Sequence, residues 1–143
     1  MQKSFHINLV KPFHTNIRKE LTKMPKVYFS DLGLRNFFVS NFKPLTKRQD
    51  KGKILENATF RQLLEKYPKD KIKFWRTSDQ KEIDFVVKNK KAFEVKSNPK
   101  SIKKSSYKKF QKEYPDIQLS IISSDINKDK LDIKYPIKEI WEL

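Results

Sequence analysis

The sequence predicts an α/β fold in which one mixed β-sheet is flanked by helices. Apolar side chains recur at helical spacing over residues 53–67, and three short strand-like runs follow between residues 72 and 96. A second helical pattern at 101–114 and an apolar run at 116–124 complete the order α-β-β-β-α-β. Strands and helices in this order are expected to form a sheet with helices on its faces.

The first helix of this order carries an acid on its apolar side. When residues 53–67 are projected at about 100° per residue, four apolar side chains form one stripe: Phe60, Leu63, Leu64 and Tyr67. Glu56 lies at the N-terminal end of the same stripe, and Pro68 ends the helix. We therefore expect Glu56 to face the sheet and not the solvent.

The residues before this core predict a few short elements. Residues 4–10 alternate between apolar and polar side chains, which is typical of a strand, and KVYF at 26–29 predicts another. A short helix is expected at 16–21. Asp31 is placed to cap a helix that runs through LGLRNFFVS.

A polar segment at 41–52 is the best candidate for an internal boundary, because it contains Pro44 and Gly52. The sequence therefore predicts a leader region at 1–50, packed on a core domain at 51–143.

The net charge is the clearest feature of the composition. The 143 residues include 33 Lys+Arg against 17 Asp+Glu, a formal net charge of +16. Such an excess fits a polyanion such as DNA, because basic side chains that neutralise phosphates release bound counterions. The alternative is a Lys-rich composition that only keeps the protein soluble.

Other classes of protein are disfavoured by composition. The sequence has no cysteine, which excludes disulfides and thiolate zinc sites. It has no apolar run of the roughly 20 residues needed to span a bilayer, and its N-terminus does not resemble a secretory signal. We expect a soluble, cytoplasmic protein without a membrane partner.

The two arms of a predicted hairpin contain charges within apolar runs. Asp84 lies in EIDFVV, and Glu94 and Lys96 lie in AFEVK. The loop Lys88-Asn89-Lys90 fits this hairpin, because Asn tolerates the left-handed conformation that such loops need. If Asp84 pairs with Glu94, strand alternation places all three charges on one face of the sheet.

Two opposed carboxylates repel each other, and a divalent cation would compensate them. Mg²⁺ prefers oxygen ligands, and Mn²⁺ is a possible substitute. Asp84 and Glu94 are therefore candidate metal ligands and catalytic residues, with Glu56 as a further ligand. Lys96 is a candidate catalytic residue that would orient a water molecule or stabilise charge on a phosphate. The alternative is an ordinary cross-strand salt bridge.

Basic residues outside the hairpin are candidates for nucleic-acid contacts. Arg76 could contact a phosphate, or could form a salt bridge to Glu82 or Asp84 on the adjacent strand. The helix at 101–114 could line a DNA channel, with Tyr107 stacking on a base. Its candidate contact residues are Lys103, Lys104 and Lys108. The alternative is a solvated helical face.

The acids and the lysine resemble the signature of the PD-(D/E)xK nuclease superfamily. Asp84, Glu94 and Lys96 match its acid and E-x-K on successive strands, and Glu56 matches the acid often found on its first core helix. Ile83 stands where the superfamily usually has proline. The resemblance implies a restriction-endonuclease-like αβββαβ core and metal-dependent cleavage of phosphodiester bonds.

Four ordered segments resemble a narrower family, the C-terminal half of ATPases that carry the DUF4143 domain. The segments are PKVYFSDLGLRNFF, GKILENATFRQLL, FWRTSDQKEIDFVV and AFEVKS. This resemblance implies an AAA-type ATPase module as a partner, in cis or in trans. The sequence contains no GxxxxGK[ST] stretch, so we expect no nucleotide site in this chain.

Three functions are consistent with these features. The first is a Mg²⁺-dependent DNA endonuclease-like domain. The second is a catalytically silent DNA-binding or targeting module of an ATPase system. The third is a protein-interaction domain, which would use an exposed apolar patch around Phe37, Phe38 and Phe42.

Overall fold

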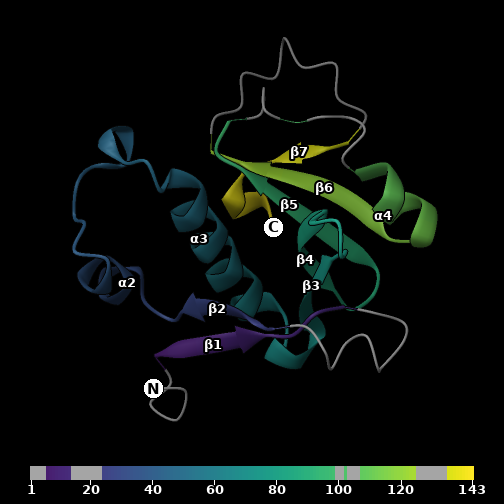
Figure 1. Cartoon of the computed structure of the whole chain (residues 1–143), viewed down its shortest axis with the longest axis horizontal. Helices are drawn as coiled ribbons and strands as arrows, with labels where there is room; N and C mark the ends of the chain where they lie inside the picture. Colours follow the sequence, from purple (N-terminus) through teal and green to yellow (C-terminus); the bar gives the residue numbers. More distant parts are fainter. Residues whose placement is uncertain (1–5, 14–23, 99–101, 103–106, 125–134) are drawn as a thin grey trace.

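The computed structural model shows a five-stranded mixed β-sheet with helices on both faces, together with a small N-terminal ribbon (Figure 1). The structure describes residues 6–13, 24–98, 102, 107–124 and 135–143. The α/β class and the predicted order of elements are confirmed.

The strands of the sheet lie in sequence order, and only their directions differ. Their bounds are β3 (Ile72–Arg76), β4 (Glu82–Val87), β5 (Lys91–Lys96), β6 (Gln118–Ser123) and β7 (Ile137–Lys138). β3, β4 and β5 pair antiparallel, whereas β5 with β6 and β6 with β7 pair parallel. The parallel pair β5–β6 requires a crossover, and α4 (Lys108–Glu113) lies within it.

Within the described residues, one helix covers each face of the sheet. α3 (Lys51–Lys66) buries Phe60 and Leu63 in a core that includes Phe85, Phe93 and Val95. The other core contains Phe110 of α4, Ala92 and Ile121. Because successive strand residues point to opposite faces, Phe93 and Val95 identify the α3 face and Ala92 the α4 face.

Helix α4 is shorter than the predicted helix at 101–114. It begins at Lys108, and Ile102 lies outside it as a partly buried loop residue. Residues 103–106 are outside the described part of the chain.

The N-terminal ribbon packs on the α3 face. It consists of β1 (Ile7–Val10) and β2 (Lys26–Phe29), which pair antiparallel, and Val10 and Tyr28 enter the core that contains Phe60. The strand predicted at 26–29 is confirmed, and the helix predicted at 16–21 lies outside the described residues.

Helix α2 (Leu32–Phe38) begins as predicted, because the Asp31 side chain accepts a hydrogen bond from the Leu34 N–H at 2.6 Å. The segment between α2 and α3 includes a 3-10 turn, η2 (Leu45–Lys47). It is held by Asp50, which pairs with Arg35 at 3.0 Å and Arg48 at 2.8 Å.

The hairpin between β4 and β5 has the predicted loop. Phe85 pairs with Phe93 and Val87 with Lys91, so residues 88–90 form the turn. Asn89 takes the expected left-handed conformation with φ 55°, and Lys88 does so too, with φ 50°.

A β-bulge interrupts β4 next to the predicted site. Lys73 pairs with Val86 and Trp75 with Ile83, so Phe74 alone opposes two residues, Asp84 and Phe85. A bulge of this kind redirects a side chain out of the regular alternation.

The bulge corrects one expectation from the sequence. Asp84 reaches Lys26 on the α3 face, whereas alternation with Phe93 and Val95 places Glu94 and Lys96 on the α4 face of β5. The three charges therefore do not share one face.

The left-handed turn makes a prediction about stability. We expect Asn89→Val to lower the free energy of unfolding by about 1 kcal/mol or more, because a β-branched residue is strained at positive φ. Urea unfolding followed by circular dichroism measures the change. Lys90→Val is the matched control, because Lys90 is not among the described residues with positive φ. Equal stability of the two variants would contradict the role of this turn.

Candidate functional site

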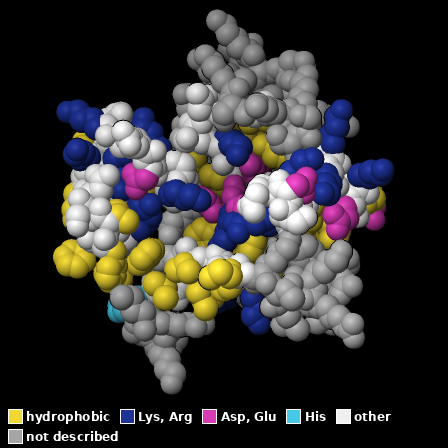
Figure 2. Space-filling model, viewed as in Figure 1, with side chains coloured by type: hydrophobic (Ala, Val, Ile, Leu, Met, Phe, Trp, Pro, Cys, Tyr) yellow, Lys and Arg dark blue, Asp and Glu magenta, His cyan; other side chains and the backbone are white. Residues whose placement is uncertain are grey.

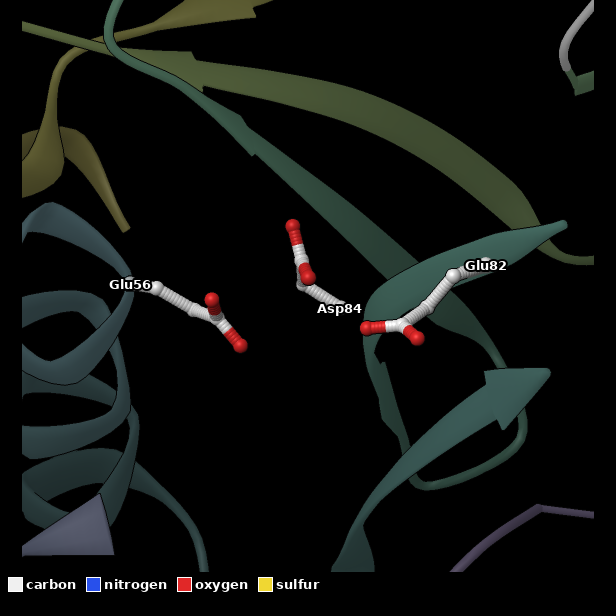
Figure 3. Close-up of side chains that lie close together, drawn as sticks. All are labelled: Glu56, Glu82 and Asp84. Carbon is white, nitrogen blue, oxygen red and sulfur yellow. The ribbon is translucent and has the colours of Figure 1, made fainter. Parts of the chain in front are cut away.

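Three carboxylates from two elements meet on the α3 face beside the bulge. Glu56, Glu82 and Asp84 each offer one oxygen, and these oxygens lie within 4.8 Å of one another (Figure 3). Glu56 comes from the buried side of α3, as predicted, and the other two come from β4. The sequence predicts Glu56 and Asp84 as ligands, but it suggests Glu82 only as a partner of Arg76.

A lysine ammonium lies among the three carboxylates. Lys26 Nζ is 2.8 Å from Glu56 Oε1 and 2.9 Å from Asp84 Oδ1, and it also contacts Glu82. The side chain of Lys26 is only 10% exposed. Burial alone would lower the pKa of Lys26, but the carboxylates of Asp84, Glu56 and Glu82 outweigh it and hold this pKa above its usual value.

Lys26 is not predicted as a site residue from the sequence, because its partners are far away in the chain. The one available signal was alternation in β2, which places Lys26 on the same side as Tyr28. In the structure Val27 is exposed and Tyr28 is buried, so this shared side faces the core.

Glu56 receives further hydrogen bonds. The Tyr28 hydroxyl donates to Glu56 Oε1 at 2.6 Å, and Lys53 Nζ lies 3.3 Å from Oε2. Tyr28 is itself held by stacking on Phe60, with ring centroids 4.7 Å apart. Burial acts to raise the pKa of Glu56, but the Lys26 charge and these hydrogen bonds lower it below its usual value.

Asp84 connects the cluster to the neighbouring strand. Its Oδ1 pairs with Lys26, and its Oδ2 accepts a hydrogen bond from the Val95 N–H at 2.9 Å. The second bond satisfies a buried backbone donor of β5 beyond the last β4–β5 pair, Phe85 with Phe93. Burial raises the pKa of Asp84, although Lys26 acts against this.

Glu94 and Lys96 form a separate pair beside Asp84. Lys96 Nζ lies 2.6 Å from Glu94 Oε1. Glu94 is 5% exposed, and its Oε2 has no hydrogen-bond partner among the described residues. Burial, together with the neighbouring Asp84 carboxylate, raises the pKa of Glu94 to about 8.

The structure thus brings the predicted residues together in two groups. Glu56 and Asp84 lie in the three-carboxylate group, and Glu94 is not one of its members in the described part of the chain. Asp84 joins the groups, because it contacts Lys26 on one side and the backbone between Glu94 and Lys96 on the other.

These donors suit a hard divalent cation in their chemistry. Carboxylate oxygens are the ligands that Mg²⁺ and Mn²⁺ prefer. The unpaired Oε2 of Glu94 is a buried acceptor that a ligand could satisfy. However, the ammonium of Lys26 lies where a cation shared by Glu56 and Asp84 would lie.

A basic cleft opens beside the cluster. A cavity of about 330 Å³ is lined by residues that include Lys26, Arg35, Lys53, Glu56 and Arg76. Figure 2 shows acidic side chains gathered near the middle of this face, bordered by Lys and Arg. A phosphate approaching the carboxylates through this cleft would meet a positive rim.

Arg76 forms the salt bridge to Glu82, which is one of the two roles predicted for it from the sequence. Its guanidinium contacts Glu82 and lies 5.2 Å from the centroid of the Phe74 ring. It also lines the cleft, so a role in contacting phosphate stays a prediction.

The lysine-rich helix lies on the other face of the sheet from the cleft. Lys108 is exposed on α4, whereas Lys103 and Lys104 lie outside the described residues. The idea that Tyr107 stacks on a nucleic-acid base is wrong, because its ring is buried edge-on against Tyr135.

The apolar patch predicted near α2 is exposed. Phe37, Phe38 and Phe42 all have about half or more of their surface accessible.

Among the described residues, none of the helices has the length and the apolar composition of a membrane span.

Comparison with family models gives two matches. Residues 51–141 match DUF4143, a domain of unknown function, and residues 1–45 match DUF8612, also a domain of unknown function. No curated protein and no solved structure matches the chain.

The raised pKa of Glu94 predicts a pH dependence of stability. The folded protein holds this proton up to about pH 8, whereas the unfolded chain releases it near pH 4.5. The free energy of unfolding should therefore fall as pH rises through this window. We expect a fall of at most about 5 kcal/mol from this group, because each unit of difference in pKa corresponds to about 1.4 kcal/mol.

Urea unfolding of the wild type and Glu94→Gln, each in EDTA across this range, measures the effect. The variant has no carboxyl proton to release at this position. The free energy of unfolding of the variant minus that of the wild type should therefore increase as pH rises. A constant difference between the two curves would show that Glu94 is already ionised at low pH.

Proposed function

We propose that this chain, which belongs to the DUF4143 family, contains a restriction-endonuclease-like domain that hydrolyses phosphodiester bonds in DNA with Mg²⁺ or Mn²⁺. The observation that carries the proposal is the bulge at Asp84. It brings Asp84 to Glu56 while keeping it hydrogen-bonded within the E-V-K segment of β5.

The residues that would hold the cation are Glu56, Asp84 and Glu82, which each offer one oxygen on the α3 face. When bound, it would polarise the phosphate and lower the pKa of a water molecule. Asp84 supports this role because its orientation is fixed by the Val95 N–H. Glu94 is predicted as a ligand from the sequence, but its side chain lies on the other face of β5, where it would act by holding Lys96.

Lys96 is the proposed catalytic lysine. Its ammonium is held by Glu94, and it would orient the attacking water and stabilise charge on the phosphate oxygens. In the reaction the water oxygen forms a bond to phosphorus, and the bond from phosphorus to the leaving sugar oxygen breaks. The attacking water releases a proton to solvent, and the leaving oxygen takes a proton from solvent.

The charge distribution supports a polyanionic substrate. The chain carries a net charge of +16, and Lys53 and Arg76 line the cleft that leads to Glu56. Phosphate contacts from such side chains supply most of the non-specific affinity for nucleic acid.

A second candidate is a catalytically silent DNA-binding or targeting module of an ATPase system. The position of Lys26 favours it, because an ammonium already neutralises the carboxylates. In this case the chain would bind DNA with strong salt dependence but would not cleave it. A partner ATPase would supply the nucleotide chemistry, since this sequence has no P-loop.

Cleavage of plasmid and linear DNA across a titration of Mg²⁺ and Mn²⁺ tests the first candidate. We expect metal-dependent cleavage by the wild type. Asp84→Asn and Lys96→Met should each reduce the rate by at least about 100-fold, the usual effect of removing a group that acts on the transition state.

Glu65→Gln is the control for charge, because Glu65 is an exposed acid on the same helix as Glu56. It should cleave like the wild type. Salt-sensitive DNA binding without cleavage at any metal concentration would favour the second candidate. If Asp84→Asn and Lys96→Met cleave normally, the assigned residues are wrong.

A further inference from the structure

Lys26 is coordinated by the acidic cluster in the way that a bound cation would be. Its ammonium has three N–H donors, and it contacts three carboxylates, from Glu56, Glu82 and Asp84. The Nζ also lies 5.6 Å from the centroid of the Phe74 ring. This cation–π contact attracts the ammonium more weakly than the carboxylates do.

We propose that Lys26 is an internal counter-cation that competes with a divalent metal ion for Glu56, Glu82 and Asp84. Under this proposal the site takes a divalent ion only when the Lys26 ammonium moves away. The inference rests on the metal site of the proposed function, but it concerns ion binding and not cleavage.

The charges explain why the two cations exclude each other. The three carboxylates carry three negative charges, and Lys26 supplies one positive charge within about 3 Å of two of them. A divalent ion that shares the same oxygens would lie within a few ångströms of the ammonium, where repulsion in a buried site is strong. One cation must therefore leave before the other binds.

The cleft beside the cluster has room for the displaced ammonium of Lys26. Lys26 lines the basic cleft of about 330 Å³ next to the cluster. The side chain has four methylene groups, and rotation about their bonds would carry the ammonium toward the cleft without movement of β2. There it would meet water or the phosphate of a bound nucleic acid.

Lys53 is an exposed lysine that contacts the same cluster, so it differs from Lys26 in its burial and in its number of partners. Its side chain is 73% exposed, and its ammonium lies 3.3 Å from Glu56 alone. Removal of this charge leaves the ammonium of Lys26 in place. Lys53→Met is therefore the matched control for Lys26→Met.

Binding of Mn²⁺ to the full chain, without DNA, tests the proposal. The loss of the electron paramagnetic resonance signal of free Mn²⁺ measures the dissociation constant. We expect Lys26→Met, which keeps the apolar stem, to bind Mn²⁺ at least about ten-fold more tightly than the wild type. Lys53→Met should change the affinity by less than about three-fold.

Thermal unfolding gives a second measurement. Lys26→Met leaves the buried carboxylates of Glu56 and Asp84 and the half-buried one of Glu82 without the Lys26 ammonium. Its melting temperature should therefore be lower than that of the wild type in EDTA. Addition of Mn²⁺ should raise the melting temperature of Lys26→Met. The same addition should raise the melting temperature of the wild type much less.

A charge-balanced variant covers the case in which Lys26→Met does not fold. Lys26→Met combined with Glu82→Gln removes one positive and one negative charge and leaves Glu56 and Asp84 as ligands. It should bind Mn²⁺ more tightly than Glu82→Gln alone. If neither variant without Lys26 binds Mn²⁺ more tightly than its parent, Lys26 does not compete with metal, and the proposal is wrong.

The outcomes separate this inference from the proposed function. Tight Mn²⁺ binding by Lys26→Met without DNA cleavage supports the inference and counts against the nuclease. Cleavage by the wild type with unchanged Mn²⁺ affinity in Lys26→Met supports the nuclease and overturns the inference.

Discussion

The ion cluster around Lys26 is the interaction on which the arrangement of this molecule depends. It ties together β2, α3 and β4, three elements from distant parts of the chain. Buried charges are costly unless each is paired, and here each carboxylate has a partner in the same group. The packing of Tyr28 on Phe60 and Phe85 holds the elements close enough for this pairing.

The cluster also shows that the N-terminal region contributes to the site. Lys26 and Tyr28 lie within the range that matches DUF8612, whereas Glu56, Glu82 and Asp84 lie within the range that matches DUF4143. A hydrogen bond and several ion pairs cross between these ranges. The chemistry of the acids therefore cannot be considered without the ribbon that covers them.

Local sequence patterns predicted much of the fold. The alternation in β5, the left-handed Asn89 and the Asp31 cap all depend on residues close in sequence, and the structure has each of them. Burial of Glu56 followed from helical periodicity in the same way. These features are local, so the sequence contains enough information to place them.

The features that define the site could not be predicted in this way. The bulge at Asp84 depends on pairing with β3, and no residue type marks it in the sequence. Lys26 meets carboxylates that are 30 and 58 residues away. Tyr107 is predicted from the sequence to stack on a nucleic-acid base, yet packing against Tyr135 buries its ring.

The hydrogen bond from the Val95 N–H to Asp84 has a consequence for the kind of ion that this pocket would accept. One oxygen of Asp84 is committed to the backbone, which leaves only the other for a ligand. Coordination of a metal ion by both oxygens of Asp84 is therefore disfavoured. Single-oxygen contact suits a small, strongly hydrated ion such as Mg²⁺, which keeps several of its waters, better than a large ion such as Ca²⁺, which collects many protein oxygens.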